Sequence, residues 1–359
     1  MLNAILSVGY AATLRVCGPF AANVVPREAL CRGRLRMRCR HGLLVLTIFL
    51  GAAFGACAQP HTLQGTVRLI VPFSAGGSTD AMARVLAAEL RRTGALNIVV
   101  DNLPGAAGKI GVAACAKANA DGRTLCLGMT TTHTLPLVFE APGETRDHLR
   151  NLVPIALVGT QPLVVSVNAR VPARNVPELV RWLRSTGDVA FSTTGVGSIS
   201  HLVGLSLAHE LGVTLTHIPF KGGESASLAA AGGQVPLTIT QLGSVLPHIT
   251  GGRLVPIATT GSSRLPTFRE VPTLSETVSP RLLFVSYVGF FAPRGIPESL
   301  AAALYENIRV ATANPEVRQR FSQLGIDLDV RPGPAFAEFL VREEATYRAL
   351  SGIQGFRLE

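Results

Sequence analysis

The sequence lacks the short glycine-containing motifs that mark the commonest nucleotide-binding and hydrolytic enzymes. It contains no Gly-x4-Gly-Lys-Ser/Thr loop and no Gly-x-Gly-x-x-Gly after its first predicted strand. It also lacks a Gly-x-Ser-x-Gly nucleophile elbow, because the segment around Ser198 reads Gly-Val-Gly-Ser-Ile. A Ser–His–acid triad assembled from distant segments stays an alternative. We therefore expect a binding protein rather than an enzyme.

Charged residues are scarce, and the excess of positive charge lies mostly at one end. They make up 16% of the 359 residues, and the formal net charge is +10. Residues 1–58 contain seven arginines, no lysine and a single acid, Glu28, which leaves little net charge for the rest. A remainder this small and scattered does not indicate a nucleic-acid partner. The length and the 47% hydrophobic content suit two globular domains.

The N-terminal segment has the pattern of a secretion signal. Arg32 to Arg40 forms a basic region, Gly42 to Phe54 an apolar one, and Ala56-Cys57-Ala58 a cleavage pattern. The apolar run, about 15 residues, is shorter than the roughly 20 that span a membrane. We therefore expect residues 1–58 to be a signal region, with cleavage after Ala58 and a periplasmic mature protein.

Alternatives stay open for this segment. Met37 directly precedes the last two arginines of the basic region and is a more typical start than Met1. Residues 1–36 are therefore interpreted as an over-long gene start. A true membrane anchor is one alternative, and a lipoprotein attached at Cys57 is another, although Phe54-Gly55-Ala56-Cys57 is a poor lipid-attachment motif.

Of the six cysteines, only Cys115 and Cys126 would remain after cleavage. An oxidising compartment favours a disulfide between them, which would link the end of a predicted helix to the next strand. Two buried free thiols are the alternative. No Cys/His cluster has the spacing of a metal site, and we predict neither a metal nor another cofactor.

Apolar segments of strand-like composition alternate with segments of helical periodicity along the rest of the chain. The first series predicts a βαβαβ unit and a parallel sheet with right-handed crossovers. Its segments are Val67–Phe73, Ala81–Arg92, Ile98–Asp101, Gly108–Ala118 and Thr124–Leu127. A second series predicts strands at Leu163–Val167, Val189–Ser192, Val213–Ile218, Val235–Thr240 and Val255–Thr259, and helices at Pro177–Arg184, Ser198–Leu211 and Glu224–Ala231. Three further helices are predicted at Pro297–Thr312, Pro315–Leu324 and Pro334–Leu350.

Turns rich in glycine and hydroxyl groups follow several predicted strands. Gly76 and Gly77 follow the first strand, and Ser78 or Thr79 can cap the next helix, a combination that suits an anion. Ligands of such sheets lie outside the carboxyl ends of the strands. Comparable turns are Asn102–Gly108, Thr130–His133, Ser192–Ser198 and Pro219–Gly223. Two α/β lobes with these turns indicate a hinged clamshell that closes on a small carboxylate.

Each turn also has a purely structural interpretation. Hydroxyl groups often cap helices, and glycines often form turns without binding anything. A single buried histidine such as His133 or His201 is more often structural than a ligand contact.

An ordered set of segments carries a specific resemblance. The segments are PFSAGGSTD (72–80), DNLPGAAGKIG (101–111), TTTHTLP (130–136), TTGVGSISHL (193–202), THIPFKGG (216–223) and GFFAPRGIP (289–297). Together they resemble the Bug family of periplasmic solute-binding receptors, the binding components of tripartite tricarboxylate transporters. The similarity extends from Val67 to about Tyr347.

The resemblance implies an α/β, two-lobe periplasmic-binding-protein (Venus flytrap) fold, type II-like, in which each lobe is a mainly parallel sheet flanked by helices. We expect residues 62–160 and 290–359 in lobe 1 and residues 161–289 in lobe 2. It also implies a carboxylate held in the cleft, largely by main-chain amides, hydroxyl groups and ordered waters. The residues expected to bind it are Ala75, Gly76, Gly77, Ser78, Thr79, Asp80, Thr130, Thr132, His133, Thr194, Gly197, Ser198, His201 and Lys221.

Departures from the family pattern bear on the ligand. Family members usually carry an acid in the strand that follows the segment GGQV (232–235), and an Asp-Asn pair soon after it. This chain has Pro236 and Thr240-Gln241 at those positions. Without that acid the cleft lacks a candidate partner for an ammonium group. We therefore predict a non-amino carboxylate, either a di- or tricarboxylate or an aromatic acid, rather than aspartate or glutamate.

The resemblance also implies partners. We expect a monomer that delivers its ligand to membrane transporter subunits. A sensor protein that reads the closed form is one alternative, and a secreted hydrolase on the same clamshell is another.

Overall fold

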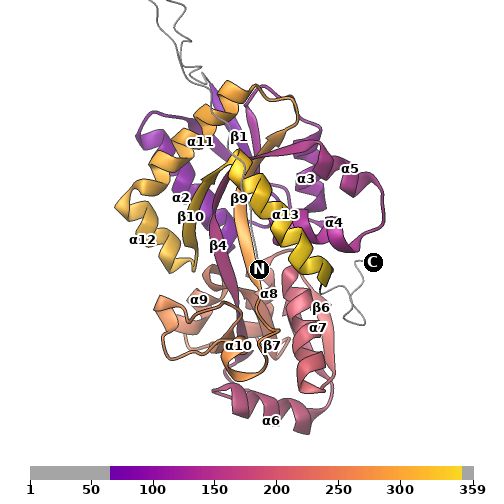
Figure 1. Ribbon diagram of the computed structural model, residues 1–359. Coiled ribbons are helices and arrows are strands. Elements are labelled where there is room, and N and C mark those ends of the chain that lie inside the picture. Colours follow the sequence, from indigo (N-terminus) through magenta and orange to yellow (C-terminus); the bar gives the residue numbers. More distant parts are fainter. Residues whose placement is uncertain (1–64, 350–359) are drawn as a thin grey trace, which may run out of the picture. The chain divides into compact units, whose positions relative to one another are not determined.

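Two sheets share one long strand in the computed structural model, which describes residues 65–349 (Figure 1). The shared strand is β4 (Leu152–Asn168), of 17 residues. Its first part pairs antiparallel with β9 (Val285–Pro293) and β10 (Asp327–Pro332). Its second part pairs antiparallel with β7 (Leu237–Gln241) and β8 (Leu254–Thr259). Strand β4 therefore crosses from one sheet into the other, with β9 alongside its first part.

The first sheet has the order β2-β1-β3-β9-β4, with β10 also on β4. Strand β1 (Thr66–Val71) pairs in parallel with β2 (Asn97–Asn102) and with β3 (Thr124–Met129). These three strands are the predicted βαβαβ unit, joined by α2 (Ser78–Arg92) and α3 (Lys109–Ala116). We call this sheet and its helices the first lobe.

The second sheet continues from β4 in the order β4-β7-β5-β6, with β8 on the other side of β4. Strand β5 (Val189–Thr193) pairs in parallel with β6 (Leu215–Pro219) and with β7. We call this sheet and its helices the second lobe. Both sheets are mixed rather than mainly parallel, because β4 and β9 enter them antiparallel to their neighbours.

The other helices lie close to the segments predicted from periodicity or fill the connections between them. They are α4 (Leu135–Phe139), α5 (Glu144–Arg150), α6 (Val176–Thr186), α7 (Ile199–Leu211), α8 (Gly223–Ala231), α9 (Leu242–Thr250), α10 (Leu274–Thr277), α11 (Glu298–Ala313), α12 (Pro315–Gln323) and α13 (Gly333–Ala349). Short non-α turns occur at η1 (Ala106–Gly108), η2 (Thr130–Thr134) and η3 (Pro266–Phe268). No helix between residues 65 and 349 has the length and apolarity needed to cross a membrane.

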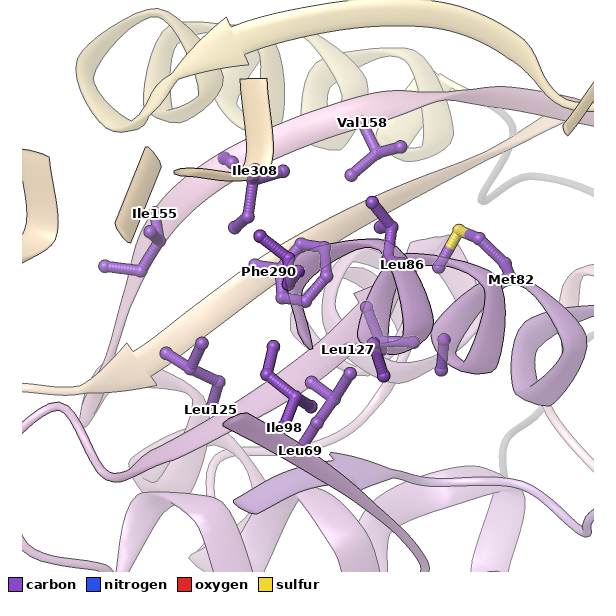
Figure 2. Close-up of a cluster of buried hydrophobic side chains, with 14 of the residues drawn as sticks. Leu69, Met82, Leu86, Ile98, Leu125, Leu127, Ile155, Val158, Phe290 and Ile308 are labelled. Carbon is purple, nitrogen blue, oxygen red and sulfur yellow. The ribbon is translucent and has the colours of Figure 1, made fainter. Parts of the chain in front are cut away.

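Each sheet has its own buried apolar cluster. In the first lobe, helices α2 and α11 pack on one face of the sheet (Figure 2). The side chains that meet there include Leu69, Met82, Leu86, Ile98, Leu125, Leu127, Ile155, Val158, Phe290 and Ile308. In the second lobe, Val165, Val167, Phe191 and Ile239 of the strands pack against residues of α6 and α7 such as Leu183 and Leu207. Burial of apolar surface stabilises both sheets, and Leu135 of α4 and Tyr347 of α13 extend the second cluster into the first lobe.

Three strand segments at the crossing were not predicted: β9, β10 and the first part of β4. Only Leu163–Val167 was predicted as a strand in this region. Residues Pro154, Gly159 and Pro162 interrupt the apolar pattern of β4, as proline and glycine do in most strands. Gly159 is required by close packing, since a Cβ there would lie 2.1 Å from the backbone oxygen of Asp327 in β10.

A disulfide joins Cys115 in α3 to Cys126 in β3, with a Cα–Cα distance of 6.1 Å. Both residues are buried in a small cluster with Tyr287, Phe291 and Phe336. The predicted signal region, its cleavage after Ala58 and the alternative lipid attachment at Cys57 lie outside the described residues.

Reduction of this disulfide should destabilise the protein. The two cysteines are 11 residues apart. In the chain-entropy model, a disulfide over this distance stabilises the folded state by about 2–3 kcal/mol, because it restricts the unfolded chain. We expect urea denaturation with a phosphine reductant to give a free energy of unfolding lower by that amount. The double variant Cys115→Ala, Cys126→Ala is the control, because its stability should not respond to the reductant. Equal wild-type stability with and without reductant would contradict the expectation.

Candidate functional site

The candidate site lies where the carboxyl ends of strands from both lobes face each other. Three hydrogen bonds cross between the lobes there. The Ser74 hydroxyl donates to the backbone oxygen of Lys221 (3.3 Å), and the Ser78 N–H donates to Ser244 Oγ (3.4 Å). The Ile199 N–H donates to Thr131 Oγ1 (3.2 Å). Because these bonds join the two lobes directly, the cleft between the lobes is closed in this structure.

A small cavity of about 10 Å³ remains between the lobes, which is about enough for the centre of one water molecule. First-lobe residues on its wall are Phe73, Ser74, Gly77, Ser78 and Thr79, and second-lobe residues are Thr194, Gly223, Gln241 and Ser244. None of these side chains is charged. Four of them, Gly77, Ser78, Thr79 and Thr194, are residues that the sequence analysis predicted.

Three helix N-termini meet at this cavity, those of α2, α8 and α9. Ser78 and Thr79 begin α2, Gly223 begins α8, and Gln241 immediately precedes α9. Helix N-termini carry unpaired N–H groups and partial positive charge, so they attract anions. A carboxylate placed here would meet N–H and hydroxyl donors and no cationic side chain, but the lobes would have to separate slightly to admit it, because the closed cavity has room for about one water molecule.

Helix α2 begins three residues earlier than its apolar periodicity predicted. Ser78, Thr79 and Asp80 are buried members of its first turn, whereas the predicted start was Ala81. The Ser78 hydroxyl donates to Gln161 Oε1 (3.2 Å), and Gln161 lies on β4 with only 1% of its surface exposed. The N-terminus of α2 is thus fixed to the crossing strand.

Close backbone approach explains Gly243 at the start of α9. A Cβ there would lie 2.8 Å from Leu324 Cδ2 and 2.9 Å from Ser78 Oγ.

Four residues on or next to the cavity wall were not among the predicted site residues: Gln161, Gly223, Gln241 and Ser244. Gly223 had a signal as the end of the turn Pro219–Gly223, and Gln241 had one as a position where the family usually carries an Asp-Asn pair. Gln161 and Ser244 had no signal in the sequence.

Asp80 organises the loop that precedes α2. Its buried carboxylate accepts hydrogen bonds from the Gly76 N–H (3.0 Å), Arg84 Nε (2.9 Å) and Asn102 Nδ2 (3.0 Å). Burial acts to raise the pKa of Asp80, but these hydrogen bonds outweigh it and hold the pKa below its usual value. The structure thus gives Asp80 protein partners, while Ala75 and Gly76 form the exposed tip of the loop, with Gly76 at a φ of +88°.

The predicted residues of η2 point in different directions. The Thr130 hydroxyl donates to Glu343 Oε1 (2.9 Å), and Thr132 Oγ1 accepts the Met129 N–H (2.9 Å). Both hydroxyl groups therefore serve the first lobe's own structure. Thr131, which lies between them, makes the contact with the second lobe.

His133 packs inside the first lobe. Its ring stacks on Phe291 with a centroid separation of 3.8 Å, and its Nδ1 is 2.9 Å from Thr132 Oγ1. Burial lowers the pKa of His133 to about 3, so the ring is neutral at physiological pH. This arrangement matches the structural interpretation of a single buried histidine.

Polar groups in the turn before α7 form hydrogen bonds with one another and with the first turn of that helix. Ser198 is the N-cap, accepting the His201 N–H (3.2 Å) and donating to the Gly195 oxygen (2.7 Å). The Gly197 N–H donates to His201 Nδ1 (3.3 Å), and Thr194 Oγ1 is 3.0 Å from Ser200 Oγ. Of these residues, Thr194 alone lines the small cavity.

His201 stacks on His217, a residue that the sequence analysis did not single out. The ring centroids are 3.7 Å apart, and His217 Nε2 lies 2.6 Å from Thr193 Oγ1. Burial lowers the pKa of both rings to about 4, and the charge of His201 contributes to the shift at His217. The pair is therefore neutral at physiological pH.

A wider pocket of about 350 Å³ joins the two lobes farther along the cleft. Its wall combines Ala106, Ala107 and Lys109 of the first lobe with Gly195, Val196, Pro219, Phe220 and Lys221 of the second. Lys109 Nζ lies 2.6 Å from Glu140 Oε1. The predicted residue Lys221 thus lies at this wider pocket and not at the small cavity.

Strained backbone forms part of this wider pocket. Ala106 and Ala107 have φ values of 47° and 53°, in the left-handed region, between Gly105 and Gly108, which also have positive φ. Left-handed backbone costs a residue with a Cβ roughly 1–2 kcal/mol. Such strain is concentrated at functional sites in proteins.

An asparagine at position 80 should remove much of the loop's anchoring. We expect Asp80→Asn to lower the free energy of unfolding at pH 7 by about 1–3 kcal/mol, because charge-assisted hydrogen bonds are lost in a buried position. A lowered carboxylate pKa adds stability above the unfolded value of 3.8, and this is lost as pH falls through the folded value. Urea denaturation from pH 2 to 7 should therefore show the two proteins converging in acid. Glu306→Gln, which removes a surface acid paired with Arg309, is the control and should change stability little.

A glycine at position 107 should relieve backbone strain. We expect Ala107→Gly to leave the free energy of unfolding unchanged or to raise it by about 1 kcal/mol. The control Ala302→Gly, in the exposed interior of α11, should lower it by about 1 kcal/mol. Equal losses in the two variants, measured by urea denaturation, would show that the left-handed residue is not strained.

Comparison with known proteins agrees with this geometry. The model of the tripartite tricarboxylate transporter family receptor matches residues 82–347. Protein BugT of Bordetella pertussis is 32% identical over 285 residues, which cover 79% of this chain and 86% of BugT. The structure of the periplasmic binding protein BugD is 30% identical, with a TM-score of 0.75 over 81% of this chain and 98% of BugD. MatC from Rhodopseudomonas palustris, solved with bound malate, is 28% identical, with a TM-score of 0.72 over 79% of this chain and 98% of MatC.

These relatives confirm two expectations from the sequence. The fold is the two-lobe α/β fold of periplasmic binding proteins, and the family consists of binding proteins rather than enzymes. The chain belongs to the tripartite tricarboxylate transporter receptor family of periplasmic solute-binding proteins.

Proposed function

We propose that this protein captures a small non-amino carboxylate between its two lobes and delivers it to the membrane subunits of a tripartite tricarboxylate transporter. In this proposal lobe 1 comprises residues 62–160 and 290–359, and lobe 2 comprises residues 161–289. The protein acts as a monomer in the periplasm after removal of residues 1–58. The observation that carries the proposal is the convergence of three helix N-termini on an uncharged, hydroxyl-lined cavity.

The donors around the small cavity suit one carboxylate group. Ser244 offers a hydroxyl group, Thr194 offers another when Ser200 donates to it, and the N-termini of α2 and α8 offer N–H groups. An anion bound there would take the place of the direct bond between Ser78 and Ser244. Its contacts with both lobes would favour the closed form over the open one.

The absence of an acid on the cavity wall supports a ligand without an amino group. Gln241 lies on the wall, and its Oε1 accepts the hydroxyl proton of the neighbouring Thr240 (3.0 Å). Asp80 is occupied by Arg84, Asn102 and the loop backbone. An ammonium group would therefore find no ionic partner among the cavity residues.

Lysines at the wider pocket support a second carboxylate on the ligand. Lys109 and Lys221 lie on opposite lobes at that pocket, and Lys221 is exposed. MatC, a solved relative, binds malate, which is a dicarboxylate without an amino group. A dicarboxylate could place one group at the helix N-termini and direct the other toward Lys221, since Lys109 is already paired with Glu140.

Ligand screening tests the proposal. We expect at least one of malate, succinate, citrate, adipate and benzoate to raise the melting temperature in a dose-dependent way, while aspartate and glutamate do not. At 100 times its dissociation constant a ligand should add about 2.7 kcal/mol of stability. A tight complex with an amino acid and none with these acids would overturn the choice of ligand class.

Single substitutions then test the site. Ser244→Ala should weaken binding of the acid found in the screen about tenfold, since it removes a buried hydrogen-bonding group. Gln241→Asp should weaken it further, because a carboxylate would face the anion. Ser185→Ala, on the exposed part of α6, is the matched control and should bind as the wild type does. Titration calorimetry measures all three, and unchanged affinity in both site variants would place the ligand elsewhere.

A further inference from the structure

The C-terminal helix contacts the candidate site through a single carboxyl group, that of Glu343 in α13. Its Oε1 accepts the hydroxyl proton of Thr130 (2.9 Å), and its Oε2 accepts that of Thr134 (2.8 Å). These threonines are the first and last residues of η2. One carboxyl group therefore holds both ends of the turn, from a position more than 200 residues away in the sequence.

The residue between these anchors contacts the other lobe. Thr131 Oγ1 accepts the N–H of Ile199, the first residue of α7 in the second lobe. Thr130 Oγ1 also accepts the Tyr287 N–H (3.2 Å), which attaches the same end of the turn to β9. The position of Thr131 thus depends on groups that η2 itself does not contain.

No cation pairs with Glu343 among the residues that the structure describes around it. The nearby titratable groups are Tyr287 of β9 and Tyr347 of α13, and burial, with a smaller contribution from the charge of Glu343, raises the pKa of both. Of the other elements packed on α13, β4 and α4 carry no titratable side chain, and η2 carries His133, which is neutral. Strand β10 carries Asp327 and an ion pair between Asp329 and Arg331. Helix α11 carries Glu298, Tyr305 and an ion pair between Glu306 and Arg309.

We infer that Glu343 is a positioning residue for the cleft, which holds Thr131 where the first lobe meets the N-terminus of α7. Helix α13 thereby helps to hold the contact between the two lobes, although none of its residues lines the cavity between them. That Glu343 matters for ligand capture rests on the proposed function. The hydrogen bonds of Glu343 and Thr131 themselves do not require a ligand.

Burial gives this carboxyl group a distinctive titration. It raises the pKa of Glu343 to about 7, although the hydroxyl groups of Thr134 and Thr130 oppose the shift. A raised carboxyl pKa adds stability that is complete below the unfolded value of 4.5 and is lost as pH rises through about 7. Wild-type stability should therefore fall over this range relative to a variant that cannot ionise at position 343.

Hydrogen exchange of the ligand-free protein tests the inference. We expect Glu343→Ala to speed exchange of the Ile199 amide at least tenfold, because its acceptor Thr131 is no longer held. Glu343→Gln, which can still accept one hydroxyl proton and donate to the other threonine, should restore much of the protection. Glu338→Ala, at an exposed position of α13, is the matched control and should leave Ile199 unchanged.

Two further measurements separate positioning from a loss of folding. Thr134→Val removes one of the same hydrogen bonds from the turn and should reproduce part of the effect if Glu343→Ala fails to fold. Urea denaturation from pH 4 to 8 should show that the stability difference between wild type and Glu343→Gln changes with pH. Unchanged exchange at Ile199 in Thr134→Val, and in Glu343→Ala if that variant folds, would overturn the inference.

The outcome is independent of the ligand screen. Exchange at Ile199 is measured without ligand, so its failure would leave the proposed carboxylate site intact. A protein that bound no acid would likewise leave the exchange result standing.

Discussion

The structure depends on the hydrogen-bond ladder of β4, the strand that pairs in both sheets. Its pairing with β9 and β10 completes one sheet, and its pairing with β7 and β8 begins the other. Each sheet buries an apolar cluster, but Leu135 of α4 and Tyr347 of α13 belong to the second cluster, so apolar packing connects the lobes as well as this ladder. Gln161 lies where β4 leaves the first sheet, and its side chain contacts the N-terminus of α2. The strand that joins the lobes therefore also fixes one wall of the site.

Next to that ladder, the buried carboxylate beside the cavity is paired within the protein and does not face the proposed position of an anionic ligand. Asp80 is buried next to the cavity, but three donors of the first lobe surround its carboxylate. The cavity itself presents N–H and hydroxyl groups from three helix starts. Partial charges fixed in a folded backbone need little reorganisation when an anion binds, and they favour the closed form only when both lobes contribute.

Much of the fold could be predicted from the sequence because helix and strand periodicity is a local property. The predicted helices at Ala81–Arg92, Pro177–Arg184 and Ser198–Leu211 lie within a few residues of α2, α6 and α7. Strands β9 and β10 and the first part of β4 were missed. Two glycines interrupt the strand pattern there because close packing requires them, Gly159 of β4 against β10 and Gly289 of β9 against Phe336 of α13. The antiparallel entry of β4 and β9 also made the sheets mixed, which a series of βα units does not predict.

The sequence by itself determined the two α/β series, the strand-end turns and the resemblance to a receptor family. Glycines and hydroxyl groups at strand ends identify loops that can approach a ligand, because the residues involved are neighbours in the chain. Tertiary structure alone decided which of those groups are available. Ser198 and Thr132 satisfy local backbone groups, His133 stacks on Phe291, and Asp80 serves its own loop, whereas Gln161, Ser244 and Glu343 reach the site from distant segments. A hydrogen bond between residues far apart in the chain depends on strand register and lobe packing, and neither is encoded in a local pattern.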